Sequence, residues 1–156
     1  MTAAAKPDRP LAANRRAFHD YHVLERFEAG VVLTGTEVKS CRAGRVQLRE
    51  GYVDFREGEA WLVGVHVSPY EHGRRDNPSP DRDRKLLLAR REIDRLAGKA
   101  RAKSFTVVPL AMYVKGSRIK LEIALVQGKQ LHDKREAARR RELEREARRA
   151  MAGEFD

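Results

Sequence analysis

The sequence predicts a mainly β fold with some helix: a small antiparallel barrel of six strands with two or three helices, followed by a basic tail. Short runs of β-branched and aromatic residues, separated by turns, recur between residues 14 and 128. From residue 129 the composition changes to Ala, Arg, Glu and Leu, which favours a helix. Residues 1–13 contain Ala, Pro and charge with little to pack. We therefore predict a disordered N-terminus over 1–13, a barrel over 14–128 and a tail over 129–156.

The first two strands are predicted on either side of Glu28-Ala29-Gly30, which we interpret as a hairpin turn. Residues 21–27 precede this turn and residues 31–33 follow it, and both runs are rich in β-branched and aromatic side chains. A short helix is expected next, with Thr36 as its N-cap and Gly44 as its C-terminal stop.

Later elements follow from the same signals. Further strands are predicted over residues 52–56, 60–67, 105–114 and 118–126. Alternation of apolar and polar residues along 118–126 is typical of a sheet with one wet face. Leu86-Leu87-Leu88 fits either a strand or a helix, because a short apolar run has no decisive period. Residues 90–97 have helical spacing and end at Gly98.

Six strands with short connections favour a closed or nearly closed barrel, because closure hides the sheet edges. An OB-like topology is frequent among small barrels that bind RNA, although the order of strand pairing cannot be determined from this pattern.

The charge of the chain favours a polyanionic partner. Its 156 residues include 33 Lys and Arg against 23 Asp and Glu, a formal net charge of +10. Such a field attracts nucleic acid, an anionic membrane surface or an acidic protein. The 24 arginines outnumber the nine lysines, which favours nucleic acid, because guanidinium groups pair with phosphate and stack on bases. No apolar run is long enough to cross a bilayer, and we expect no membrane partner and a cytoplasmic location.

The tail has the composition of a helix that cannot pack firmly. Residues 129–151 contain nine basic and five acidic residues, and their apolar stripe is thin. We expect this tail to be frayed when free and to become helical on a polyanion, because phosphate contacts then offset the ordering entropy. A solvated surface helix of an ordinary domain is the alternative.

Motifs for catalysis and metal binding are scarce in the sequence. It has no phosphate-binding Gly-Lys-Ser or Gly-Lys-Thr loop, no His-Glu-x-x-His and no Cys-x-x-Cys, and Cys41 is the only cysteine. A metal-independent ribonuclease remains a catalytic alternative, with His19 and His132 as acid and base and Lys134 on the phosphate. Because these groups can also contact RNA without cutting it, we predict no enzyme activity, no metal and no cofactor.

Several short segments together closely resemble the SsrA-binding (small protein B) family. They occur in family order across residues 14–135, with the Arg-rich tail in the family's position. The segments are residues 14–21, 27–30, 35–40, 84–88 with Glu92, Ile93 and Leu96, residues 108–110, and residues 128–129 with 132–135. Two positions differ from the family pattern, since Gln130 replaces a lysine and Cys41 replaces a leucine.

The resemblance implies an OB-like barrel with three helices that binds the tRNA-like domain of transfer-messenger RNA (tmRNA). The expected partners are this RNA, as a 1:1 complex with a monomer, and the stalled ribosome, whose vacant A site receives the complex. The tail would contact the small-subunit decoding centre and mRNA channel. A ribosomal or general structured-RNA-binding protein without a rescue role is the alternative function.

The resemblance and the chemistry of the side chains together give two sets of candidate residues. The expected RNA-binding residues of the barrel are Asn14, Arg15, Arg16, His19, Tyr21, Glu28, Glu37, Lys39, Arg42, Leu87 and Lys129. The expected ribosome-binding residues of the tail are His132, Asp133, Lys134, Arg135, Arg139, Arg140, Arg145, Arg148, Arg149 and Met151. Barrel packing is the alternative role for Tyr21 and for Leu87.

Overall fold

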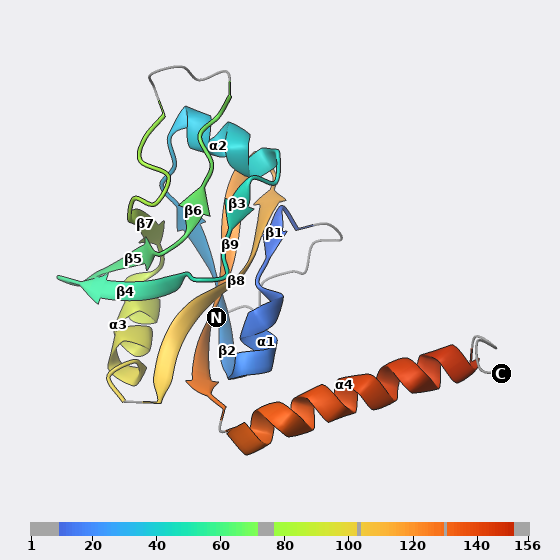
Figure 1. The fold of residues 1–156 in the computed structure, drawn as a ribbon. Helices are drawn as coiled ribbons and strands as arrows, with labels where there is room; N and C mark the ends of the chain where they lie inside the picture. The colour runs from blue at the N-terminus through green and yellow to red at the C-terminus, as the bar shows by residue number, and fades with distance from the viewer. Residues whose placement is uncertain (1–9, 72–76, 103, 130, 152–156) are drawn as a thin grey trace.

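The computed structural model describes residues 10–71, 77–102, 104–129 and 131–151, with only the backbone for 131–134 and 136–137. Strands predominate, and helices lie around them (Figure 1). The elements are β1 (Ala12–Ala13), α1 (Arg15–Asp20), β2 (Tyr21–Val31), α2 (Gly35–Arg42), β3 (Val46–Gln47), β4 (Tyr52–Arg56), β5 (Glu59–Val63), β6 (His66–Val67), β7 (Arg84–Leu87), α3 (Arg90–Lys99), β8 (Phe105–Lys115), β9 (Arg118–Gly128) and α4 (Leu131–Met151).

Seven of these strands form one antiparallel sheet in the order β1-β8-β9-β2-β7-β5-β4, and β3 pairs with β6 separately. The sheet is curved enough for β4 to contact β8, yet no hydrogen-bonded ladder joins them in the described part of the chain. The mainly β prediction is confirmed, whereas the predicted count of six strands is too low. The two-residue strands β1, β3 and β6 are too short to produce a sequence pattern.

Two hairpin turns lie between strands that the sequence predicts. Glu57 and Gly58 join β4 to β5 with φ angles of 51° and 76°, the left-handed conformation of a two-residue hairpin turn. Gly116, with φ 64°, helps to join β8 to β9. The predicted strand 60–67 is instead divided at Gly64, whose φ of 78° ends β5 before β6 begins.

The predicted hairpin turn at Glu28-Ala29-Gly30 is wrong. These residues lie inside β2, an uninterrupted strand of 11 residues that pairs with β9 along almost its whole length. Gly30 serves close packing, because a Cβ atom there would lie 3.2 Å from the Cβ of Leu87 on β7. Glycine in the middle of a strand can therefore mark the close approach of another strand as well as a turn.

Both faces of the central strands are covered. The larger apolar cluster lies on the inner face and includes Phe27, Leu121 and Ile123 from the sheet with Leu96 from α3. A smaller cluster on the other face packs under Ala17 of α1. The burial of both faces fits the apolar residues on both sides of β8 in its middle section and of β9 over residues 123–126.

A pair of hydrogen bonds marks the start of α2, and a glycine marks its end. Thr34, not the predicted Thr36, is the N-cap: its hydroxyl accepts a hydrogen bond from Glu37 N–H, and the Glu37 carboxylate accepts one from Thr34 N–H. Gly44 follows the helix with φ 77°, as the predicted stop requires.

The folded body begins before residue 14, its predicted N-terminal boundary. Ala12 and Ala13 form β1 and pair with Met112 and Ala111 of β8, so the structured region begins within the segment predicted to be disordered. The six-residue helix α1 follows, and the sequence pattern does not predict it. Residues 1–9 lie outside the described part of the chain.

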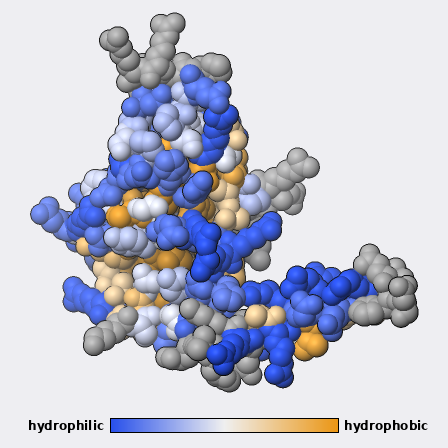
Figure 2. Space-filling view, in the orientation of Figure 1, coloured by the Kyte–Doolittle hydropathy of each residue, from blue (hydrophilic) through white to orange (hydrophobic). Residues whose placement is uncertain are grey.

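Helix α4 extends away from the sheet as a single rod (Figure 1). Every α4 side chain that the structure describes is exposed, including Leu143 and Met151. Figure 2 shows mostly hydrophilic residues along this helix. Residues 131–151 are thus helical in the structure, and the predicted ordering of the tail on a polyanion stays a prediction. Among the described residues, helices that combine the length and apolar character of a bilayer span are absent.

Candidate nucleic-acid interface

Asn14, predicted to contact RNA, is turned into the protein. Its side-chain amide donates a hydrogen bond of 2.9 Å to the Pro109 carbonyl, and its backbone N–H donates to Leu110. The side chain is 5% exposed, and its Oδ1 has no hydrogen-bond partner among the described atoms. Asn14 therefore anchors the start of α1 on β8, and we do not retain it as an RNA contact.

The α1 helix exposes cations on one side and packs on the other. Arg15 and Arg16 are exposed, and Arg16 donates to the Asp20 carboxylate at 3.2 Å. His19 is half-buried, with its Nδ1 2.9 Å from the same carboxylate. Tyr21 packs partly against the smaller apolar cluster. This position favours barrel packing, the alternative role for Tyr21, over RNA contact.

Glu28 lies on the outer face of β2 and is held by two partners from β8. The Tyr113 hydroxyl donates a hydrogen bond to its carboxylate, and Lys115 Nζ donates another at 3.1 Å. The hydrogen bond from Tyr113 is the main cause that lowers the pKa of Glu28, so this carboxylate is ionised at neutral pH. Burial and the neighbouring carboxylate raise the pKa of Tyr113, which stays a donor. Glu28 is thus a fixed acceptor among cations.

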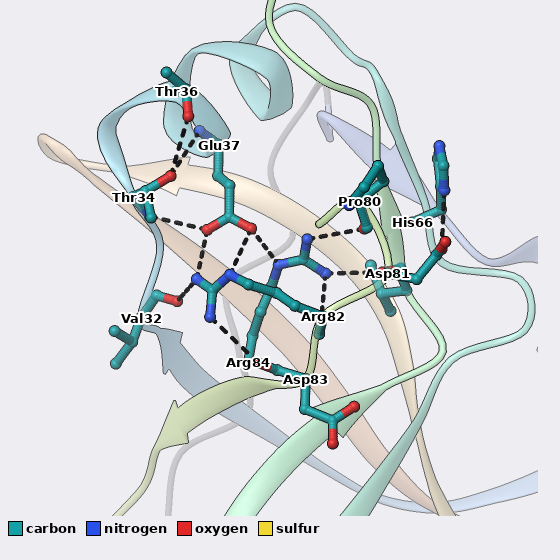
Figure 3. A network of polar contacts seen from close by, with 11 residues as sticks. Val32, Thr34, Thr36, Glu37, His66, Pro80, Asp81, Arg82, Asp83 and Arg84 are labelled. Carbon is teal, nitrogen blue, oxygen red and sulfur yellow. Dashed lines mark hydrogen bonds and ion pairs between the residues drawn. The ribbon is translucent and has the colours of Figure 1, made fainter. Parts of the chain in front are cut away.

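Glu37 does not face the solvent. Its carboxylate accepts hydrogen bonds from Arg84 Nε at 2.7 Å and from Arg82 Nη2 at 2.5 Å, in addition to Thr34 N–H (Figure 3). Glu37 and Arg84 are 3% and 1% exposed, so a buried ion pair is present. Arg84 also donates to the carbonyl of Val65. The predicted RNA contact of Glu37 is therefore not retained, since its carboxylate holds α2 to the segment before β7.

The charge state of Glu37 follows from these partners. Burial alone would raise its pKa, but the hydrogen bonds from Arg82, Thr34 and Arg84 outweigh that effect and lower it. Both members of the pair are thus charged at neutral pH, and each compensates for the other's loss of water.

The cations of α2 are available at the surface. Lys39 is exposed and its Nζ lies 5.4 Å from the centre of the Tyr70 ring, within the range of a cation–π contact. Arg42 is exposed and its guanidinium approaches the Ser117 carbonyl at 3.5 Å, which brings α2 beside the β8–β9 turn. Both side chains are exposed, so their cationic groups are accessible to a phosphate, and their contact with RNA stays a prediction.

Leu87 is a surface residue, whereas its neighbour Leu86 belongs to the core. Leu86 is 1% exposed and Leu87 is 54% exposed, as expected for successive residues of a strand. Leu87 lines a groove of about 240 Å³ together with β2, α2 and the beginning of β9. Other side chains around the groove include Val38, Arg118 and Lys120.

Lys129 connects the tail to α1. Its Nζ donates a hydrogen bond of 3.1 Å to the Phe18 carbonyl, and its N–H donates one of 2.9 Å to the Asp20 carbonyl. A cation at the C-terminal end of a helix is favourable, because the last carbonyls have no partner within the helix. Lys129 therefore holds the base of the tail rather than extending into solvent.

The tail presents an exposed, mainly cationic surface. The side chains of His132, Asp133 and Lys134 lie outside the described part of the structure. The described candidates Arg135, Arg139, Arg140, Arg145, Arg148, Arg149 and Met151 are all exposed. Glu142 forms ion pairs with Arg145 at 2.8 Å and with Arg149 at 3.5 Å, and the exposed arginines of the helix outnumber its described acidic residues.

The only cysteine cannot act as a nucleophile at neutral pH. Cys41 is fully buried on α2, and burial raises the pKa of its thiol to about 11. Within the described ranges, groups of three or more His, Cys, Asp or Glu side chains that could hold a metal ion are absent.

The comparisons with known proteins agree with this arrangement. Residues 11–153 match the family model described as SmpB protein. The chain belongs to the SmpB family. Two of its relatives are called SsrA-binding proteins: that of Carboxydothermus hydrogenoformans is 50% identical over 93% of this chain and 97% of its own. That of Gloeothece citriformis is 56% identical, over 90% and 92% of the two chains.

A solved SmpB-like structure has the same fold. It comes from work described as "tmRNA-SmpB: a journey to the center of the bacterial ribosome". It is 44% identical and superimposes with a TM-score of 0.68, covering 85% of this chain and 96% of the other.

Two residues of this SmpB-family surface are not among those predicted from the sequence. Lys115 and Lys120 belong to the same outer face as Glu28, because Glu28 pairs with Glu122 and Gly30 pairs with Lys120. The polar positions of the alternating run 118–126 give a signal for Lys120. The strand pairing that brings Lys115 close to Glu28 cannot be predicted from the residues that neighbour either position in the sequence.

Proposed function

We propose that this chain binds the tRNA-like domain of tmRNA and acts with it in trans-translation on stalled ribosomes. The observation that carries the proposal is the SmpB family match over residues 11–153, joined to the fold shared with a chain from a tmRNA–SmpB ribosome study. The chain binds and presents RNA, catalyses no bond change and needs no metal or cofactor. It works as a monomer, one per RNA, in the cytoplasm beside the ribosome.

The RNA-binding surface of this proposal is the outer face of β2 and β9 with the adjacent α2. Exposed Lys39 and Arg42 contact phosphates, whereas the ionised Glu28 accepts hydrogen bonds from base amino groups or ribose hydroxyls. Leu87 adds apolar contact, and Arg15 and Arg16 extend the positive charge along α1.

The body and the tail have separate tasks in this proposal. The body from β1 to β9 forms an OB-like barrel, an interpretation supported by the contact of β4, at one end of the sheet, with β8, which is next to the other end. Residues 129–156 enter the empty decoding centre and mRNA channel, and the exposed arginines of α4 support contact with ribosomal RNA there.

The decisive experiment compares two RNAs of equal length, the tRNA-like domain of tmRNA and an unrelated hairpin, by fluorescence anisotropy with the full chain. We expect at least tenfold tighter binding of the tRNA-like domain. We also expect the logarithm of affinity to fall with the logarithm of salt concentration at a slope of about −5, for roughly six phosphate contacts. Equal affinity for both RNAs would instead support a general structured-RNA-binding protein.

A further inference from the structure

Two carboxylates lie directly opposite each other on the outer face of the sheet. Glu28 on β2 pairs with Glu122 on β9, and directly paired residues of antiparallel strands present their side chains to the same face. Like charges in this arrangement destabilise a sheet. Each carboxylate therefore needs a partner that compensates for its charge and keeps it in place.

Glu122 is compensated from its own side of the sheet. Arg26 lies on β2, two residues before Glu28, and its Nη1 is 3.4 Å from Glu122 Oε1. The Glu122 side chain is 8% exposed, so this ion pair is largely shielded from water. Glu28 is held differently, by groups that come from β8.

Tyr113 reaches Glu28 across the strand that separates them. Strand β9 lies between β2 and β8, so the two side chains meet over β9 on the outer face. The Tyr113 hydroxyl donates to Glu28 Oε2, and Lys115 Nζ donates to Oε1 at 3.1 Å. Tyr113 is 2% exposed, so packing fixes the direction of its donor. The Lys115 side chain is 58% exposed and flexible, so it restrains the carboxylate less firmly.

We propose that Tyr113 is a positioning residue for RNA recognition, which fixes the Glu28 carboxylate so that it accepts hydrogen bonds only from a correctly placed RNA donor. Tyr113 is buried and acts through Glu28, without contacting the RNA. An ionised carboxylate in a fixed position repels phosphate, so RNAs that bring their backbone to this point are disfavoured. The inference rests on the proposed function, in which Glu28 accepts hydrogen bonds from base amino groups or ribose hydroxyls.

The charge of Glu28 depends on the same contact. The hydrogen bond from Tyr113 is the largest cause that lowers the pKa of Glu28, whereas burial acts in the opposite direction. Lys115 and the charge of Lys120 lower the pKa further by smaller amounts. Loss of the Tyr113 hydroxyl should therefore raise the pKa of Glu28 and also leave the carboxylate free to rotate.

The first test compares the tRNA-like domain of tmRNA with an unrelated hairpin of equal length by fluorescence anisotropy at pH 7. Tyr113→Phe removes the donor but keeps the ring, and it should weaken binding of the tRNA-like domain about fivefold, the effect of one hydrogen bond. Affinity for the hairpin and the salt dependence should not change, because no charge is removed. Tyr52→Phe is the matched control, since Tyr52 is 44% exposed on β4, and it should leave both affinities within about twofold. Equal weakening for both RNAs, or none, would overturn the role of Tyr113.

A double variant tests whether Tyr113 acts through Glu28. Glu28→Ala should weaken binding of the tRNA-like domain, and adding Tyr113→Phe should cause no further loss, because the hydroxyl then has no carboxylate to hold. Losses that multiply would show that Tyr113 acts independently of Glu28 and would refute the inference. If the unaltered protein shows no preference for the tRNA-like domain, the proposed function itself fails. If that preference is present and Tyr113→Phe retains all of it, only the role of Tyr113 fails.

Carbon-13 NMR titration of the Glu28 carboxyl group tests the contact without RNA. The pKa of Glu28 should lie below 4.5 in the unaltered protein and should be higher in Tyr113→Phe. A value of 4.5 or above in the unaltered protein would contradict the inference even if Tyr113→Phe does not fold.

Discussion

Glu37 and Arg84 form an ion pair inside the protein, where each charge has lost nearly all of its water. Removing one partner of such a pair is costly, because the other charge stays buried without compensation. The pair joins α2 to β7, and Arg84 also donates hydrogen bonds to the carbonyls of Val65, just before β6, and Pro80, shortly before β7. Loss of this ion pair should therefore lower the stability of the whole body and should not remove a direct RNA contact.

Glu37→Gln should lower the free energy of unfolding at pH 7 by about 3 kcal/mol, because the Arg84 charge loses its counter-charge. Urea unfolding measures this difference. Glu50→Gln is the matched control, since the Glu50 side chain is 85% exposed, and it should change stability by less than about 0.5 kcal/mol. Equal stability of Glu37→Gln and the unaltered protein would contradict the role given to the pair.

The same substitution has a predictable pH dependence. The pKa of Glu37 in the folded protein is lowered from the usual 4.5, so its contribution is complete above pH 4.5 and is lost as pH falls through the folded value. The stability difference between the unaltered protein and Glu37→Gln should consequently shrink as the pH is taken below 4.5.

Elements with strong local patterns are predicted well, and those fixed by distant contacts are not. Strand β4, strand β9 and helix α3 have a clear period and turn residues at their ends, and their predicted bounds are close to those observed. The short helix α1 instead depends on Asn14 binding the carbonyl of Pro109, 95 residues away. The residues around α1 in the sequence contain no pattern that indicates this contact.

The same limit applied to the candidate site. Glycine in Glu28-Ala29-Gly30 was interpreted as a turn because the sequence does not show that β7 packs over it. The sequence alone places both the charged residue Glu37 and the apolar residue Leu87 on the RNA surface. Only the three-dimensional arrangement shows that Glu37 is buried and Leu87 exposed.

At the junction of α1 and α4, Lys129 should restrict the direction of the tail. Lys129→Met removes the hydrogen bond to the Phe18 carbonyl and should cost only about 1 kcal/mol of stability. The distance distribution between spin labels at Lys99→Cys and Ala147→Cys should become broader. Lys85→Met, another partly exposed lysine with an ion pair, is the control and should leave the distribution unchanged. The same width in both variants would show that Lys129 does not direct the tail.

For the molecule as a whole, the described tail and body share few contacts outside the α1–α4 junction, so their functions should be separable. Deleting residues 133–156 should change affinity for the tRNA-like domain by less than about threefold. The same deletion should abolish addition of the tmRNA-encoded peptide on stalled ribosomes in a reconstituted translation assay. Loss of both together would mean that the tail itself holds the tRNA-like domain.

Helix α4 also sets a length scale for the molecule. Its 21 residues correspond to about 31 Å at 1.5 Å per residue. Because the helix projects from one corner of the body, its far end can contact one RNA while the sheet binds another RNA about one helix length away. The length of α4 therefore fixes the distance between its tip and the body. Shortening the helix by two turns would move the tip back by about 11 Å, away from the group that it contacts.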